Sequence, residues 1–155
     1  MKKILLIVFL FLLAGCSSQD LALEDLKEKY PQAFGNSIES FSKDQQEKIG
    51  LPDEVPFDVS SVEASSDEDR VQVNYQSEGK QKLKVRTIYD PGNILKESDL
   101  QVNLNSGAVA GVQEEEDHVY VEWYNNKDDV VYQLEYYGAD NEKRTQKAIE
   151  IANAI

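Results

Sequence analysis

Residues 118–137 decide the fold, and their sequence is HVYVEWYNNKDDVVYQLEYY. Apolar side chains alternate with polar or outward-facing ones in 118–124 and again in 130–137, which predicts two strands that each bury one face. Residues 125–128, Asn-Asn-Lys-Asp, are typical of a hairpin turn. Parallel neighbours need crossovers of about a dozen residues, so these two strands must pair antiparallel.

The same alternation recurs before this hairpin. It predicts further strands at 57–64, 71–75, 83–89 and 108–113, separated by short polar turns. Asp90-Pro91-Gly92-Asn93 is a strong turn signal, and 94–104 is a looser connection. We therefore expect a mostly antiparallel meander sheet of about six strands, mostly in sequence order.

Helical patterns lie at both ends of the folded part. The C-terminal pattern has Asp140 or Asn141 as its cap, an apolar face of Ala148, Ile151, Ala152 and Ile155, and Glu142, Lys143, Arg144 and Lys147 toward water. Near the N-terminus, a thin apolar stripe over 38–49 predicts a second helix that ends at Gly50. Residues 17–36 contain a few leucines, a little helix and stops at Pro31 and Gly35. The sequence thus predicts one α+β domain over 37–155, covered by a C-terminal amphipathic helix, with short N-terminal helices and a tether over 16–36.

The first sixteen residues have the anatomy of a secretory signal. Two lysines are followed by an apolar run over 4–13, which is too short to cross a bilayer core of about 30 Å. The ending Leu13-Ala14-Gly15-Cys16 resembles the lipobox of bacterial lipoproteins. The resemblance implies that the signal peptidase recognises Leu13, Ala14 and Gly15, that residues 1–15 are removed, and that Cys16 carries a covalent diacylglyceryl group with further acylation, such as palmitate.

Composition agrees with a surface anchor. The net charge is −13, and removal of residues 1–15 leaves 14 basic against 29 acidic side chains, or −15. Such a chain is repelled by anionic headgroups, so lipid has to supply the attachment. A pI near 4.4 argues against nucleic acid as a partner. The single cysteine excludes an internal disulfide framework.

A second resemblance covers roughly residues 50–155. Trp123 in a strand, Tyr132-Gln133-Leu134 in the next strand and a final helix ending in Ile151-Ala152-Asn153 are similar to an uncharacterised C-terminal domain of Gram-positive lipoproteins and extracytoplasmic anti-sigma-factor regions. That family supplies no catalytic residues. Together with the two-lysine start, it favours the outer face of a Gram-positive cell membrane. In a Gram-negative cell, Ser17 in place of Asp after the cysteine would direct the protein to the outer membrane.

Few residues are candidates for catalysis or metal binding. His118 is the only histidine and follows the acidic run Glu114–Asp117, but no Ser or Cys partner is near it in sequence. The acidic run, and also Asp67-Glu68-Asp69, could supply oxygen ligands to Ca²⁺. The alternative for each run is a solvated hairpin connection, and neither has the spacing of an EF-hand. We predict no catalytic residues and no metal site.

Two groups form the candidate binding surface, because alternation places each on the face opposite the core. Lys82, Lys84 and Arg86 form a basic stripe that could meet an acidic partner, a glycan or a headgroup, or could pair with Glu122 or Glu135 on neighbouring strands. The second group consists of Tyr120, Tyr124 and Tyr137. Exposed tyrosines bind sugars or peptides well, but a half-buried cross-strand role or cover by the 38–49 helix is the alternative.

We therefore expect a lipid-anchored, extracytoplasmic binding or accessory protein of the bacterial envelope, without enzymatic activity and without a cofactor other than the lipid on Cys16. Its partners would be the membrane, through the anchor, and another envelope protein or a glycan. One alternative is a small-molecule or lipid-handling domain, which needs a hollow between helix and sheet. Another is a metal-dependent hydrolase that uses His118 and Glu114–Asp117. The sequence leaves the oligomeric state open.

Overall fold

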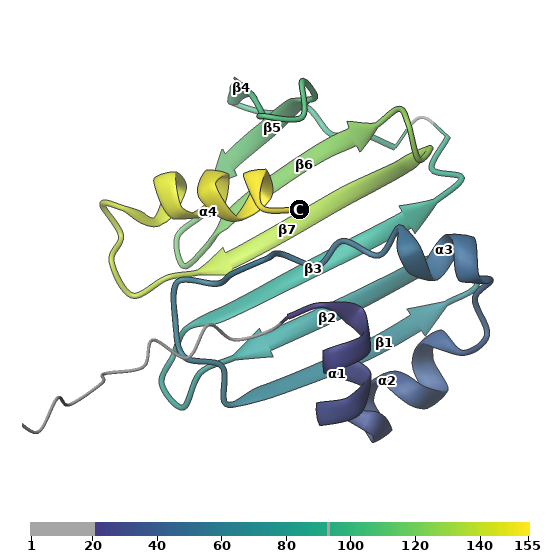
Figure 1. Ribbon diagram of the computed structural model, residues 1–155. Helices are drawn as coiled ribbons and strands as arrows, with labels where there is room; N and C mark the ends of the chain where they lie inside the picture. The colour runs from purple at the N-terminus through teal and green to yellow at the C-terminus, as the bar shows by residue number, and fades with distance from the viewer. Residues whose placement is uncertain (1–20, 93) are drawn as a thin grey trace, which may run out of the picture.

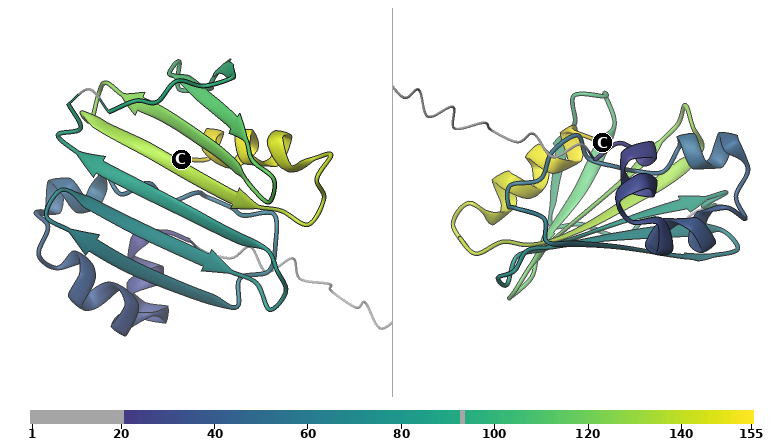
Figure 2. Two further views of the ribbon diagram at one scale, coloured as in Figure 1. Left: turned by 180° about the vertical axis from the view of Figure 1, so that it is seen from behind. Right: turned by 60° about the horizontal axis from the view of Figure 1, so that its bottom comes forward.

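The computed structural model describes residues 21–92 and 94–155. These residues form one antiparallel sheet of seven strands, with all the helices on one face (Figures 1 and 2). The strands are β1 (Ser61–Asp67), β2 (Arg70–Gln76), β3 (Lys82–Tyr89), β4 (Leu100–Asn103), β5 (Val109–Glu114), β6 (Val119–Asn125) and β7 (Val130–Tyr137). The helices are α1 (Leu23–Lys29), α2 (Pro31–Ile38), α3 (Lys43–Glu47) and α4 (Arg144–Asn153). The predicted α+β class is confirmed.

The strand order across the sheet is β1-β2-β3-β7-β6-β5-β4. Two meanders, β1–β3 and β4–β7, therefore join through β3 and β7, where Val85 lies opposite Leu134. Because β4 is at the far edge from β3, the chain between them has to get past β7, β6 and β5. Residues 94–99, which we call the strap, make the last part of this passage on the face without helices.

The core lies between the sheet and the helices. On strand β7, Tyr132 and Leu134 are buried against the helical layer, whereas Gln133 and Glu135, which alternate with them, point to the other face and are half-buried. The ring centroids of Trp123 and Tyr132 are 5.3 Å apart in this core. The hairpin predicted at 125–128 joins β6 to β7 as expected, with Val121 opposite Leu134.

The N-terminal helices belong to the folded domain. Leu26 of α1 and Phe34 of α2 are fully buried in the same core cluster. The described part of the predicted tether, residues 21–36, is thus packed on the folded domain and does not form a tether. The stop expected at Pro31 is confirmed for α1, which ends at Lys29, but Pro31 also begins α2, where a missing N–H costs nothing. The stop expected at Gly35 is wrong, because Gly35 lies inside α2.

The predicted helix over 38–49 is also wrong as one piece. Residues between Ile38 and Lys43 leave the helical path, and α3 starts afresh with a capping box in which Ser42 and Gln45 bond reciprocally. The predicted strand at 57–64 is displaced to β1, residues 61–67.

The start of α4 differs from the prediction as well. The helix begins at Arg144, and its N-cap, Lys143, makes no capping side-chain bond. Arg144 was expected in water, yet its side chain is buried and donates to the carbonyl of Glu116 and to Oδ1 of Asn141. Arg144 therefore holds the helix start against the β5–β6 turn.

Candidate binding surface on the uncovered face

The sheet face opposite the helices, which we call the uncovered face, carries the residues that the sequence singled out. Alternation along β3 turns Lys82, Lys84 and Arg86 to this face, and alternation along β6 and β7 does the same for Tyr120, Tyr124 and Tyr137. Both groups therefore share one surface. The side chains of the two groups differ in how many contacts they make with neighbouring residues.

The basic stripe is bonded to adjacent strands. Lys84 donates to Glu135 over 2.6 Å, as the cross-strand alternative expected. Burial, the largest single influence on Glu135, raises its pKa, but the hydrogen bonds from Lys84 and Tyr137 outweigh it and hold the pKa below its usual value. Lys82 lies 4.4 Å from the centre of the Tyr137 ring. The stripe is thus an ordered surface rather than a row of free cations.

Arg86 sits at the centre of a hydrogen-bonded network that crosses four strands. Its guanidinium donates to Gln72 over 2.7 Å on one side and to Gln133 over 2.8 Å on the other. The amide of Gln133 in turn donates to Glu122 over 2.7 Å. Side chains from β2, β3, β7 and β6 are thereby fixed relative to one another, so the middle of the uncovered face is pre-organised.

The three tyrosines have different exposures. Tyr124 is 40% exposed and donates to Asp129. Tyr137 is half-buried, bonded to Glu135 and stacked on the His118 ring at 4.8 Å between centroids. The exposed role is wrong for Tyr120, which is only 8% exposed, and the buried alternative holds for it. The 38–49 segment does not supply the cover, because the helices lie on the other face of the sheet (Figure 2). The Lys96 ammonium of the strap lies 4.8 Å from the centre of the Tyr120 ring, and burial together with Glu122 raises the pKa of the Tyr120 hydroxyl.

Glu122 is the buried polar residue of this face, with 4% exposure. Its carboxylate accepts hydrogen bonds from the Lys96 backbone N–H, the Tyr120 hydroxyl and the Gln133 amide, each 2.7 Å long. A buried carboxylate is costly unless it is bonded in this way. Glu122 therefore ties the strap to β6.

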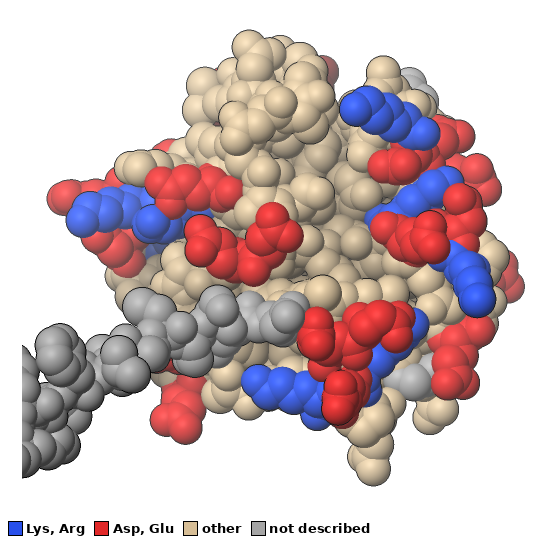
Figure 3. Space-filling model, viewed as in Figure 1, with Lys and Arg blue, Asp and Glu red and all other residues tan. Residues whose placement is uncertain are grey.

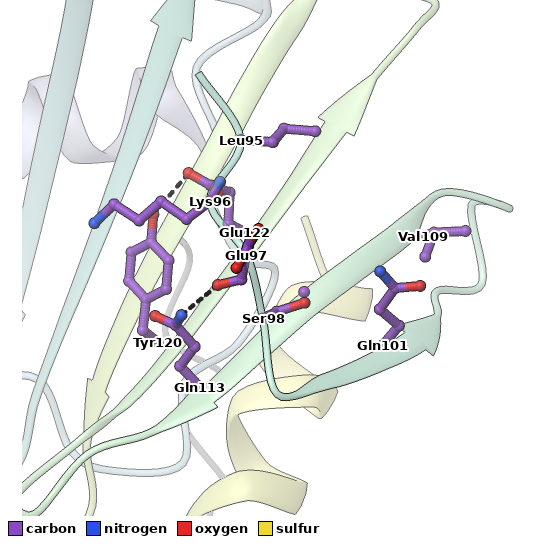
Figure 4. Close-up of a pocket in the computed structure, with 10 residues that line it drawn as sticks. Leu95, Lys96, Glu97, Ser98, Gln101, Val109, Gln113, Tyr120 and Glu122 are labelled. Carbon is purple, nitrogen blue, oxygen red and sulfur yellow. Dashed lines mark hydrogen bonds between the residues drawn. The ribbon is translucent and has the colours of Figure 1, made fainter. Parts of the chain in front are cut away.

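A recess of about 270 Å³ lies beside the strap (Figure 4). Its walls include Leu95 and Glu97 of the strap, Val109 and Gln113 of β5, and Tyr120 and Glu122 of β6. The strap approaches β5 so closely that a Cβ on Gly111 would lie 2.8 Å from Ser98. The absence of a side chain at Gly111 is what lets the strap lie there. The recess combines apolar walls with a buried acceptor, as small-molecule sites do.

His118 and the acidic runs lie at the ends of strands. His118 Nδ1 is 2.8 Å from Asp117, whose pKa is lowered chiefly by that hydrogen bond. Glu114 ends β5, and residues 115–117 lie in the turn before β6. Asp67 ends β1, and residues 68–69 form the turn before β2, where Arg70 bonds Asp69. Across 21–92 and 94–155, no group of three or more His, Cys, Asp or Glu side chains is arranged to hold a metal ion.

The sequence did not reveal the strap, Gln133 or the burial of Glu122. Glu122 was expected only as an ion-pair partner of the basic stripe, and Arg86 instead reaches it through Gln133. A glutamate inside the apolar run VYVEW and a glycine inside β5 were the available signals of a buried acceptor and a close backbone approach.

Comparisons of the chain with protein-family models, with curated proteins and with solved structures find no match. Among the described residues, no helix is long and apolar enough to cross a bilayer. Leu13, Ala14, Gly15 and Cys16, on which the anchor prediction depends, lie outside the described residues.

Proposed function

We propose that this chain is a lipid-anchored, extracytoplasmic binding protein of the bacterial envelope and that it binds through the uncovered face. The anchor part of the proposal is supported by the sequence Leu13-Ala14-Gly15-Cys16 after a short apolar run. The binding part is supported by the architecture of the sheet. One face packs against the helices to form the core, and this leaves the other face available for a partner.

The observation that carries the binding part is the order of the uncovered face. Arg86, Gln133 and Glu122 are held in one network, and the strap is fixed over Tyr120. A surface that is already ordered loses less conformational entropy when a partner binds. Next to this network, Tyr124 offers an exposed aromatic ring for contact.

Lipid anchoring would promote binding by this surface. Confinement to the membrane plane raises the effective concentration toward other membrane-bound molecules without any new contact. The mature charge of −15 keeps the domain itself off anionic headgroups, so the uncovered face stays available to partners. No step of this mechanism requires a catalytic residue.

The test is chemical crosslinking of the native protein in its own membrane, followed by mass spectrometry, with Cys16→Ala as the comparison. We expect one defined partner, crosslinked to the anchored form and lost or strongly reduced with Cys16→Ala. Recovery of the same partner from both forms would contradict the role of the anchor. Recovery of no partner from either form would contradict the binding function.

A second candidate function, capture of a small polar molecule, is favoured by the recess beside the strap. Its volume of about 270 Å³ holds a molecule of monosaccharide size, and the Glu122 carboxylate can accept one further hydrogen bond from a ligand hydroxyl or amine. Saturation-transfer NMR with a mixture of monosaccharides and amino acids tests it. A signal that Glu122→Gln abolishes would support this candidate, and no signal at millimolar ligand would exclude these two ligand classes.

A further inference from the structure

The two edges of the sheet differ in how far the rest of the chain covers them. Strand β1 is the outer strand at one end, and helix α2 packs beside it. Strand β4 is the outer strand at the other end, and no helix packs along it in Figure 1. Helix α4 reaches only the turn after β4, where Asn153 Oδ1 accepts a hydrogen bond from the N–H of Asn105. Unpaired strand edges are templates for pairing with another chain, and proteins normally protect them.

The hydrogen-bond phase of β4 is fixed by its own hairpin. The N–H of Leu104 donates to the carbonyl of Ala108 over 2.9 Å, so Leu104 faces β5. Residues of an antiparallel strand alternate between the two neighbours, and therefore Val102 and Leu100 also bond to β5. The backbone N–H and C=O groups of Gln101 and Asn103 then point away from the sheet.

The β1 edge is guarded at the equivalent place. The hydroxyl of Ser37 in α2 donates to the outward carbonyl of Ala64 over 3.0 Å. Charged side chains at Glu63 and Asp67 also lie on β1. On β4, the sequence Leu-Gln-Val-Asn contains no charge and no proline that would prevent strand addition.

Exposed apolar side chains concentrate around the β4 edge. The large hydrophobic residues that are clearly exposed in the described chain are Ile94, Leu95, Leu100, Val109 and Tyr124. Four of these five lie in the strap or in the β4–β5 hairpin. Residues 100–113 contain no charged side chain, and the matching surface is the uncharged lobe at the top of Figure 3. Such a patch on an otherwise acidic protein marks an interaction site.

The sequence of the edge is self-complementary. Residues 100–104 read Leu-Gln-Val-Asn-Leu, which is symmetric in residue type about Val102. When a second copy is laid antiparallel with Val102 opposite Val102, Gln101 falls opposite Asn103 of the other copy. Both of these residues have outward backbone groups, so each such pair makes two hydrogen bonds. Leu100, which is 48% exposed, falls opposite Leu104 of the other copy.

We propose that a second copy of this chain pairs along β4, joining the two sheets into one through a two-fold axis at Val102. An isologous contact of this kind closes after two copies and does not propagate. The axis is perpendicular to the sheet, so the uncovered faces of both copies point the same way and form one surface with two recesses. The uncharged strand lets two acidic copies approach, and membrane confinement favours their pairing.

Single-cysteine crosslinking of the full chain in its membrane tests this pairing. In the proposed register Val102 faces itself in a non-hydrogen-bonded pair, with Cα atoms about 4.5 Å apart, which suits a disulfide. Under mild oxidation we expect Val102→Cys to give at least about fivefold more disulfide-linked dimer than Ser65→Cys on the guarded β1 edge. The unsubstituted chain is the control for Cys16.

Co-expression of Gln101→Cys with Asn103→Cys tests the register at exposed positions where folding is not at risk. We expect a mixed dimer of these two variants. In the Val102→Cys background, Gln101→Pro removes one outward N–H per copy, and we expect it to reduce the dimer while the melting temperature stays within a few degrees.

Three results would overturn the proposal. They are absence of the mixed dimer, a Val102→Cys dimer that Gln101→Pro leaves unchanged, and a Val102→Cys adduct with a different protein, which would assign the edge to another occupant. A chain that captures a partner in the membrane but forms no β4-linked dimer would retain the proposed function and lose only this inference.

Discussion

The covered and uncovered faces of the sheet belong to the same strands but are stabilised by different interactions. On β7, Leu134 is fully buried under the helices, whereas its neighbour Gln133 is half-buried and donates to Glu122 on the other side. The covered face gains its stability from apolar burial, which is non-directional. The uncovered face is ordered by directional hydrogen bonds, which contribute less net free energy but fix geometry. The difference separates the face that stabilises the fold from the face that we propose binds a partner.

The largest expected effect is on the covered face. Leu134→Ala should lower the free energy of unfolding by about 2–5 kcal/mol, because it leaves a cavity at a fully buried site. Lys82→Ala on the same sheet's uncovered face is the control and should cost no more than about 1 kcal/mol, since it loses only the contact with the Tyr137 ring. Urea unfolding of the detergent-solubilised protein, followed by the fluorescence of Trp123, measures both. Equal losses for the two variants would break the contrast between the faces.

A smaller effect is expected from the one buried acid of the uncovered face. Glu122→Ala removes the acceptor of three hydrogen bonds and should cost about 1–3 kcal/mol. Its specific signature is faster hydrogen exchange at the Lys96 amide, since the strap loses its tie. Glu122→Gln keeps one acceptor oxygen and is the matched control. An unchanged exchange rate at Lys96 in Glu122→Ala would show that the strap is held by other contacts.

Tyr75 tests whether a hydrogen bond contributes to stability on the covered face. Its hydroxyl is buried in the covered face and has no hydrogen-bond partner among the described residues, and burial raises its pKa. Tyr75→Phe should therefore be neutral or stabilising by up to about 1 kcal/mol. Tyr132→Phe, which loses a 2.9 Å bond to the Lys48 carbonyl, should instead destabilise by about 1 kcal/mol. A loss in Tyr75→Phe as large as in Tyr132→Phe would reveal a hidden partner.

The smallest expected effect is the pH dependence of the Lys84–Glu135 pair. The pKa of Glu135 is lowered in the folded chain, so its contribution is present above the unfolded value and is lost as the pH falls through the folded value. Lys84→Met should reduce the loss of stability between about pH 6 and about pH 3, by less than about 1 kcal/mol. Urea midpoints at the two pH values measure it. If the urea midpoint falls by the same amount between the two pH values in both proteins, the Lys84–Glu135 pair does not contribute to the pH dependence.

The sequence predicted the fold class because alternation and turn signals are local. The hairpin at 125–128 and the terminal helix follow from them directly. The insertion of β7 between β3 and β6 does not, since a hairpin pattern says which strands are consecutive but not which edges meet. The N-terminal helices were underestimated because Leu26 and Phe34 gain their burial from the sheet rather than from their own thin stripe.

The site was predicted in part. Strand alternation placed the basic stripe and the tyrosines on one face, and Lys84 does pair with Glu135. Burial of Tyr120 was one of the two alternatives, but the segment that covers it could not be foreseen, because the strap comes from a connection without periodicity. Glu122 and Gly111 were visible as exceptions inside apolar strands, and such exceptions mark positions where another segment approaches.

The uncovered face as the binding surface is tested most directly by site-resolved photo-crosslinking in the native membrane. A benzoylphenylalanine replaces Tyr124, which is exposed on the uncovered face, or Tyr30, a half-buried aromatic at the end of α1 on the helical side. Each variant is made with and without Cys16→Ala. We expect a defined adduct from position 124 of the anchored form, little from position 30, and loss of the adduct without the anchor. An adduct from position 30 but not from position 124 would contradict the proposed binding surface.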